Sequence, residues 1–211
     1  IYESPVSIRW FTPSIEVDLC GHATLASARI LFECYPDLAG EEINFDSKSG
    51  NLKITRVDRG LCLNFPVDYP AEVESDPLFF EILGIKPLRL LRGKDDFLAI
   101  FKSQKQIEEM RPKFSLLKKV DARGLVISAP GDDVDFVSRC FYPEAGIEED
   151  PVTGSAHTML TPYWATQFNK NELDAHQLSK RGGKLNCRLA NERVLISGNS
   201  VIYFEGTISI V

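Results

Sequence analysis

Hydrophobic and polar residues follow one order over the first third of the chain: strand alternation, then helical spacing, then strand alternation again. Residues 6–10 alternate as in a strand, and residues 21–32 place apolar side chains on one face of a helix. Three short alternating runs follow at 43–47, 52–57 and 61–65, separated by turn sequences rich in Gly, Asn and Asp. This order predicts a helix followed by a β-meander.

A similar order returns in the rest of the chain. Runs at 125–129 and 134–141 have strand character, and residues 154–168 predict a second, mostly apolar helix. Residues 66–77, rich in proline and acidic side chains, form the candidate linker between the two stretches. Further strands are predicted at 184–189, 193–197 and 201–210.

A near-repeat links the two stretches. Arg-x-Phe-x-Pro occurs at 9–13 and again at 139–143, and each copy is followed by a loop, an acidic residue, a glycine and the predicted helix. Internal repeats are typical of duplicated structural units. The sequence therefore predicts an α+β fold of two similar halves, each a curved sheet around a central buried helix, with one active site between them.

Composition narrows the classes of function. The chain has 211 residues, is 44% hydrophobic and carries a net charge of −6, so it can bury a core and is a poor candidate for binding nucleic acid. No apolar run approaches the ~18 residues of a membrane span, and the start of the chain lacks the pattern of a signal peptide. Five cysteines without a CxxC pair favour free thiols in a reducing cytoplasm. Ile1 in place of Met indicates a piece of a longer polypeptide.

The starts of the two predicted helices are candidate anion sites. Gly21-His22-Ala23 and Thr153-Gly154-Ser155 are glycine-containing starts, which let backbone N–H groups point at a ligand. Two such starts facing one cleft would hold a carboxylate and stabilise enolate-like charge. The alternative is ordinary helix capping, because Thr, Ser and Asp are favoured capping residues.

Three titratable residues lie beside these glycines. His22 is a candidate proton carrier, or a buried histidine at a helix start. Asp150 is a candidate general acid or base, or a cap of the second helix. Cys20 is a candidate thiolate next to a helix N-terminus, or a small buried hydrophobe.

The remaining cysteines and histidines do not form a predicted site. A metal site from Cys20, His22 and His157 is poorly spaced, so no metal is expected. The other cysteines lie in helix- or strand-patterned runs and are expected in the core: Cys34, Cys62, Cys140 and Cys187.

Taken together, the motifs resemble those of a known family, the phenazine-biosynthesis PhzF-like proteins. Cys-Gly-His-Ala-Thr (20–24) after the first Arg-x-Phe-x-Pro is similar to their first signature, and Glu-Asp-Pro-Val-Thr-Gly-Ser-Ala-His (149–157) to their second. Gln-x-Ser-x-Arg-Gly-Gly (177–183) matches a third, so the resemblance covers essentially the whole chain.

The resemblance implies the fold of diaminopimelate epimerase, in two pseudo-symmetric domains. Residues 1–68 would be the first half, without its N-terminal segment, and residues 69–199 the second. Residues 200–211 would return to pack on the first half.

The resemblance also implies an isomerase of small carboxylates that uses no cofactor or metal and forms a homodimer. Carried over by motif, His22 and Asp150 would handle the proton. The residues implied to bind substrate are Cys20, Gly21, Ala23, Thr153, Gly154 and Ser155.

Two departures from related proteins affect this expectation. The family's principal acid/base is a Glu in an Asn-Leu-Ser-Glu-Thr stretch, which residues 1–211 do not contain, so the alternative is an impaired binding protein of the same fold. Related racemases use two cysteines, and Thr153 stands where the second would be. Because a threonine hydroxyl is too weak an acid to replace a thiol, a two-cysteine racemase is disfavoured.

Overall fold

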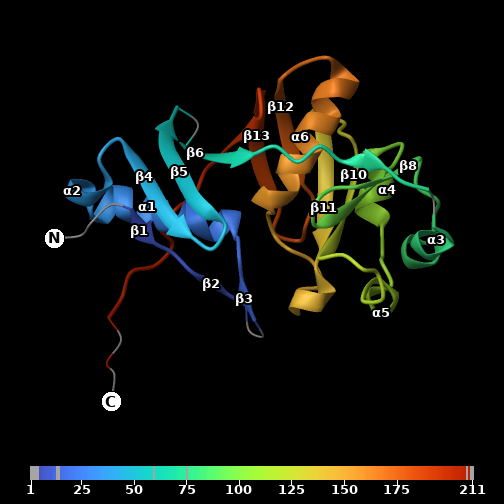
Figure 1. Ribbon diagram of the computed structural model, residues 1–211, viewed down its shortest axis with the longest axis horizontal. Helices are drawn as coiled ribbons and strands as arrows, with labels where there is room; N and C mark the ends of the chain where they lie inside the picture. Colours follow the sequence, from blue (N-terminus) through green and yellow to red (C-terminus); the bar gives the residue numbers. More distant parts are fainter. Residues whose placement is uncertain (1–4, 13–14, 59, 75, 208, 210–211) are drawn as a thin grey trace.

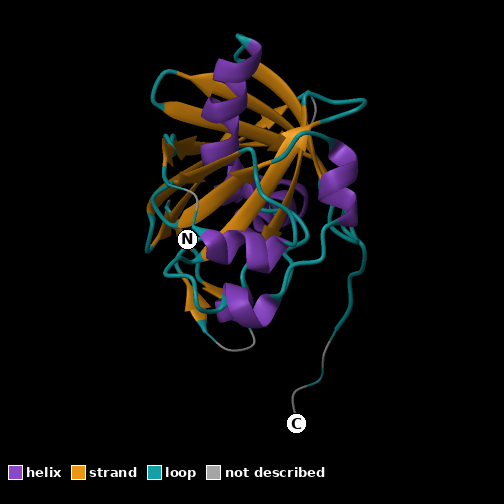
Figure 2. Ribbon diagram, turned by 90° about the vertical axis from the view of Figure 1, so that its right-hand side faces the viewer, coloured by secondary structure: helices purple, strands orange, loops and turns teal. Residues whose placement is uncertain are grey.

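The computed structural model describes residues 5–12, 15–58, 60–74, 76–207 and 209, and it has the predicted α+β class (Figure 1). One large, mostly antiparallel sheet runs through the described part of the chain. In spatial order its strands are β1 Val6–Ser7, β4 Glu42–Ser47, β5 Gly50–Val57, β6 Gly60–Pro66, β14 Arg193–Gly198, β13 Gly183–Ala190, β12 Glu172–Gln177, β11 Phe136–Phe141, β10 Gly124–Pro130, β9 Asp96–Ile100, β8 Arg89–Arg92 and β7 Ala71–Glu72. Figure 2 shows these strands at a range of angles, as expected for a twisted, curved sheet.

The first stretch folds as the sequence predicts. Helix α1 (Gly21–Cys34) buries Ala28 and Phe32 against the antiparallel meander β4–β5–β6. The predicted first strand is divided in two. β1 pairs in parallel with β4, whereas β2 (Trp10–Phe11) pairs with β3 (Glu16–Val17) in a separate small hairpin.

The second stretch surrounds helix α6 (Gly154–Phe168). This helix is buried on most of its faces, including Leu160 and Trp164, which confirms the prediction of a central apolar helix. Strands β10 to β13 adjoin it. Within this stretch β9–β10 and β11–β12 pair in parallel, and the other neighbouring strands are antiparallel.

The two stretches share a sheet and a core. β14 pairs antiparallel with β6, with Val194 opposite Phe65, so the sheet continues from one stretch into the other. Phe32 of α1 and Leu160 of α6 belong to one hydrophobic cluster. The proposed boundary between halves at residues 68 and 69 therefore stays a prediction.

A second cluster lies where short helices pack on β8–β11. The helices are α3 (Pro77–Leu83), α4 (Gln104–Glu109) and α5 (Phe114–Leu117). Asp76 caps α3 by accepting a hydrogen bond from the Leu78 N–H at 2.8 Å, and Gly84 ends it with a left-handed φ of 74°. The remaining short helices are α2 (Pro36–Ala39) and the 3₁₀ turn η1 (Pro143–Ala145).

Three sequence predictions are wrong. Residues 201–207 form no strand and lie exposed, with Tyr203 98% exposed, because no neighbouring strand among the described residues offers them backbone partners; the rest of the predicted strand falls largely outside the described residues. The candidate linker contains β7, which pairs with β8. Cys34 is exposed at the end of α1, whereas Cys62, Cys140 and Cys187 are buried as predicted.

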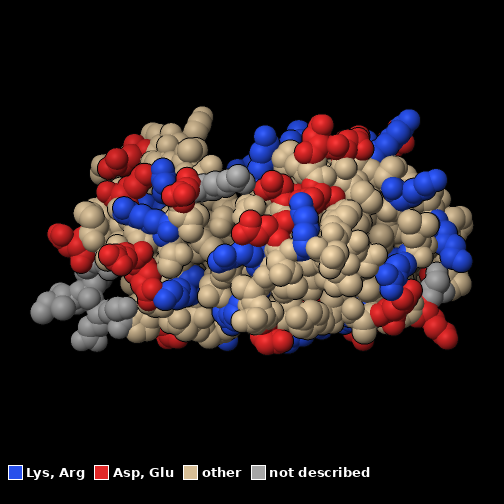
Figure 3. All heavy atoms as spheres, turned by 90° about the horizontal axis from the view of Figure 1, so that it is seen from above, with Lys and Arg blue, Asp and Glu red and all other residues tan. Residues whose placement is uncertain are grey.

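The surface of the protein carries charged side chains of both signs. Figure 3 shows acidic and basic side chains interspersed over the face seen from above. All five cysteines are free thiols, as predicted. Across the described ranges, no helix has the length and apolar character needed to cross a membrane.

Candidate active site

The starts of α1 and α6 touch each other through two glycines. A Cβ atom added to Gly21 would lie 3.1 Å from Gly154 Cα, and one added to Gly154 would lie 3.3 Å from Gly21 Cα. Only glycine allows so close an approach without displacing the backbone. The near-repeat therefore brings two helix N-termini, with their partly unpaired N–H groups, to one place.

Neither helix start is capped by a side chain. Cys20 and Thr153 occupy the N-cap positions with extended backbone, and neither makes a side-chain cap hydrogen bond. Thr153 therefore does not act as an ordinary capping residue, which was the alternative expected from the sequence. Anion binding at a helix start uses backbone N–H groups that capping would otherwise occupy.

His22 and Asp150 meet beside the two glycines. His22 Nδ1 lies 4.0 Å from Asp150 Oδ2 and 3.0 Å from the carbonyl oxygen of Val152. Because a carbonyl only accepts, Nδ1 carries a proton and donates to Val152, which leaves Nε2 as the titrating nitrogen. The His22 side chain is 47% exposed and that of Asp150 only 12%.

Cys20 is the third group at this point. Its Sγ lies 3.6 Å from His22 Nε2. This contact is the largest cause that raises the pKa of His22 to about 9, with the charge of Asp150 and the Val152 carbonyl adding to it and burial opposing it. His22 is therefore an imidazolium at neutral pH.

Asp150 is held by a hydrogen-bond network on its buried side. Thr153 Oγ1 donates to Asp150 Oδ2 at 2.5 Å, and Gln177 binds both the Thr153 N–H and the Asp150 carbonyl at 2.7 Å. Burial raises the pKa of Asp150, while the Thr153 hydroxyl and the His22 and Arg123 charges oppose that rise. Sequence reasoning matched Gln177 to a motif but gave it no place in the site.

A second cysteine lies under the site, which the sequence did not predict. Cys140 on β11 is fully buried beside Thr153 and Asp150, and burial raises the pKa of its thiol. Cys140 is buried as expected, but it also lies beside the candidate site, as Cys20 does. The near-repeat carried the signal, because Cys140 belongs to the second Arg-x-Phe-x-Pro copy.

Ser155 connects α6 to a neighbouring ion pair. Arg123 Nη2 donates to Ser155 Oγ at 3.2 Å, and the same guanidinium makes a bidentate pair with the buried Asp96. The Tyr142 hydroxyl donates to Asp96 at 3.4 Å. Ala23, by contrast, is half-buried and packs against the core shared by the two halves.

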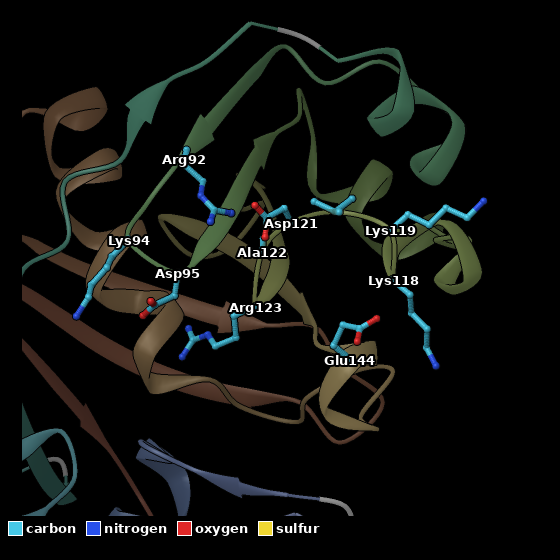
Figure 4. Close-up of a pocket in the computed structure, with 10 residues that line it drawn as sticks. Arg92, Lys94, Asp95, Lys118, Lys119, Asp121, Ala122, Arg123 and Glu144 are labelled. Carbon is cyan, nitrogen blue, oxygen red and sulfur yellow. The ribbon is translucent and has the colours of Figure 1, made fainter.

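A hollow of about 590 Å³ lies beyond Arg123 rather than at the helix starts (Figure 4). The Arg92 side chain extends toward Asp121 and Ala122, while Lys118 and Lys119 extend outward. None of the residues predicted from the sequence lines this hollow. The hollow is lined by Arg92, Lys94, Asp95, Lys118, Lys119, Val120, Asp121, Ala122, Arg123 and Glu144.

Comparisons with known proteins agree with this arrangement. A family model of phenazine biosynthesis-like proteins, PhzC-PhzF, matches residues 2–206. An uncharacterized isomerase of Pseudomonas aeruginosa is 49% identical over 201 residues, which are 95% of this chain and 77% of that protein. A crystal structure of a phenazine biosynthesis protein of the PhzF family from Enterococcus faecalis superposes with a TM-score of 0.92 at 40% identity, covering 100% of this chain and 81% of that one.

A more distant structure shows the fold alone. A hydroxyproline epimerase from Agrobacterium vitis superposes with a TM-score of 0.61 at 11% identity, covering 95% of this chain and 70% of that chain. The predicted epimerase-like fold is therefore confirmed.

Proposed function

Because the chain belongs to the phenazine biosynthesis-like PhzC-PhzF family, with relatives named as isomerases, we propose that it is an isomerase that moves a proton on a small carboxylate substrate without a cofactor. One observation carries this proposal. His22 from the first repeat and Asp150 from the second lie 4.0 Å apart beside the two joined helix starts.

The charges of the pair suit opposite roles. With its pKa at about 9, His22 is a proton donor at neutral pH, and Nε2 is the nitrogen that gives up its proton because Nδ1 is bound to Val152. Asp150 is the proton acceptor, and burial makes its carboxylate more basic than usual. Proton transfer by such positioned groups is worth roughly 10²–10⁴ in rate.

The proposed reaction uses one proton acceptor, Asp150, and one proton donor, His22. Asp150 removes a proton from a carbon next to the substrate carboxylate, and the electron pair shifts into the conjugated system. His22 Nε2 delivers a proton to a second carbon, which completes the isomerisation. Asp150 then loses its proton to solvent, and Nε2 of the neutral His22 takes one up from solvent, so that both groups return to their starting states while Nδ1 keeps its proton on the Val152 carbonyl. In the proposal, the N–H groups at Gly21 and Gly154 bind the substrate carboxylate.

The test is solvent-deuterium incorporation into a set of small carboxylates, followed by mass spectrometry. It uses the complete gene product that contains these 211 residues, so that any group outside them is present. His22→Gln and Asp150→Asn should each slow exchange by roughly 10²–10⁴.

Matched controls are His176→Gln on β12 and Asp132→Asn, whose residue is exposed in a loop. Both controls should exchange at the wild-type rate. Wild-type exchange in His22→Gln and Asp150→Asn would refute the assignment of these residues. Carboxylate binding without exchange in the complete protein would refute the isomerase and favour the binding protein.

A further inference from the structure

Gln177 is a buried polar residue below the candidate site. It ends β12, where it lies opposite Gly183 of β13, and its side chain reaches the loop before α6. It is only 1% exposed. Buried amides normally have all their hydrogen bonds made, so its partners show what it does.

The Gln177 amide makes three hydrogen bonds to two residues. Its Oε1 accepts from the Thr153 backbone N–H at 2.7 Å, and its Nε2 donates to the Asp150 carbonyl at 2.7 Å and to Thr153 Oγ1 at 3.2 Å. The partners fix the orientation of the amide, because a backbone N–H can only donate and a carbonyl can only accept.

This orientation also fixes the Thr153 hydroxyl. Since Nε2 donates to Thr153 Oγ1, that oxygen accepts one hydrogen bond and is free to give its own proton. The proton goes to Asp150 Oδ2, 2.5 Å away. A donor held on a carboxylate stabilises its charged form and restricts its rotation.

We propose that Gln177 is a positioning residue that turns the Thr153 hydroxyl toward Asp150 and thereby holds the carboxylate that accepts the proton. The inference rests on the proposed function, because it assumes that Asp150 takes the proton. Gln177 acts only through the loop of residues 150–153 and through the hydroxyl of Thr153.

Other groups face Asp150 and must be left unchanged in any test. His22 comes from α1 and Arg123 from the segment before β10, and both charges lower the pKa of Asp150. Cys140 on β11 and Tyr142 after it are buried, and the charge of Asp150 helps to raise the pKa of each. The variants below alter none of these four residues.

The first measurement is the titration of the Asp150 carboxyl by ¹³C NMR in the complete protein, assigned by its loss in Asp150→Asn. Gln177→Met and Thr153→Val should each move the titration upward by about one pH unit, because the carboxylate loses its oriented donor. The double variant should show no further shift beyond Thr153→Val, and Thr153→Ser should titrate like the wild type. Gln177→Glu keeps the shape and the acceptor for Thr153 N–H, lacks the donor, and should also shift the titration upward.

The second measurement is the deuterium exchange described above. Gln177→Met and Gln177→Glu should lower kcat by roughly 10- to 100-fold with little change in KM, and should move the acid limb of the pH profile upward. The proposal would be overturned if the Asp150 titration were unchanged in Gln177→Met and Gln177→Glu. It would also be overturned if the shifts of Gln177→Met and Thr153→Val added up in the variant that carries both changes. A shifted titration in a protein whose wild type shows no exchange would confirm the hydrogen-bond role and refute the proposed function.

Discussion

His157 offers a test of burial that is independent of activity. This residue on α6 is fully buried, donates Nδ1–H to the Thr153 carbonyl at 2.7 Å, and lies 5.9 Å from the Phe136 ring between centroids. Among the residues the structure describes, its Nε2 is buried without a hydrogen-bond partner. A proton on Nε2 would therefore place a charge where nothing accepts it.

The expected effect on stability follows from the pKa of His157. Burial lowers this pKa from 6.5 to about 4. Between these values the unfolded chain binds a proton that the folded protein does not, so the free energy of unfolding falls as pH drops from 6.5 through about 4. At 1.36 kcal/mol per pH unit, the loss is about 3 kcal/mol.

Urea unfolding from pH 7 to pH 4 measures this loss by comparison with His157→Asn. The asparagine keeps a donor near Thr153 and does not titrate, and its cavity costs the same at each pH. The stability difference between wild type and variant should therefore shrink by about 3 kcal/mol over this range. His176→Asn, on β12, should retain the fall seen in the wild type because His157 is intact. A difference that stays constant within about 0.5 kcal/mol would refute the argument.

Three further predictions follow from contacts at the site and its repeats. Gly21→Ala places a methyl group 3.1 Å from Gly154 Cα, so urea unfolding should show a loss of about 1–3 kcal/mol and deuterium exchange should slow; a gain in stability would contradict the close approach. The rate of deuterium exchange should fall as pH rises through about 9, where His22 loses its proton, and this fall should be missing in His22→Gln. The protonated His22 also contributes to the free energy of unfolding below pH 6.5, and this contribution is lost as pH rises through about 9. The contribution should be small because the side chain is half-exposed. Arg139→Met removes a bidentate pair with Glu149 and two hydrogen bonds to backbone carbonyls, so the free energy of unfolding in urea should fall by about 3 kcal/mol. Arg9→Met removes an exposed pair and should change this free energy little. Equal losses in the two variants would refute the argument.

Local periodicity was enough to predict the elements that carry the core. The helix over 21–32 and the meander after it were visible because each buries one face, so apolar residues recur at 3.6 or 2.0 positions. The tail at 201–207 shows the same strand pattern but has no partner strand in the described structure. An alternating pattern shows that a segment can form a strand, but the segment pairs only where the edge of another strand lies beside it.

The residues of the candidate site also differ in how far the sequence could predict them. The glycines and the His22–Asp150 pair could be found from the near-repeat, because its two copies lead to the two helix starts that meet at this point. Gln177 could not be assigned from its own surroundings, since its partners lie 24 and 27 positions earlier in the chain. The strand pattern around Cys140 predicts only that this residue is buried, and it does not show that the buried thiol lies beside Asp150.

The two repeat arginines show what the duplicated motif does structurally. Arg9 pairs with Glu16, and Arg139 pairs with Glu149, each through two nitrogens of the guanidinium. The second pair ties β11 to the loop before α6, whereas the first ties the residue just before β2 to β3, in the small hairpin that precedes α1. The motif thus holds the backbone that presents the catalytic candidates, and the arginines themselves do not reach the pair.

The halves nevertheless provide unequal groups at that common place. The first supplies an exposed imidazole whose pKa is raised, and the second supplies a carboxylate that is mostly buried and tied by Thr153. A reaction that removes a proton at one carbon and returns one at another needs a donor and an acceptor in opposite protonation states at the same pH. Two equal thiols would suit inversion at a single carbon. The asymmetry of His22 and Asp150 fits the proposed proton shift between two carbons. In that proposal the buried carboxylate accepts first, and the exposed imidazolium donates second.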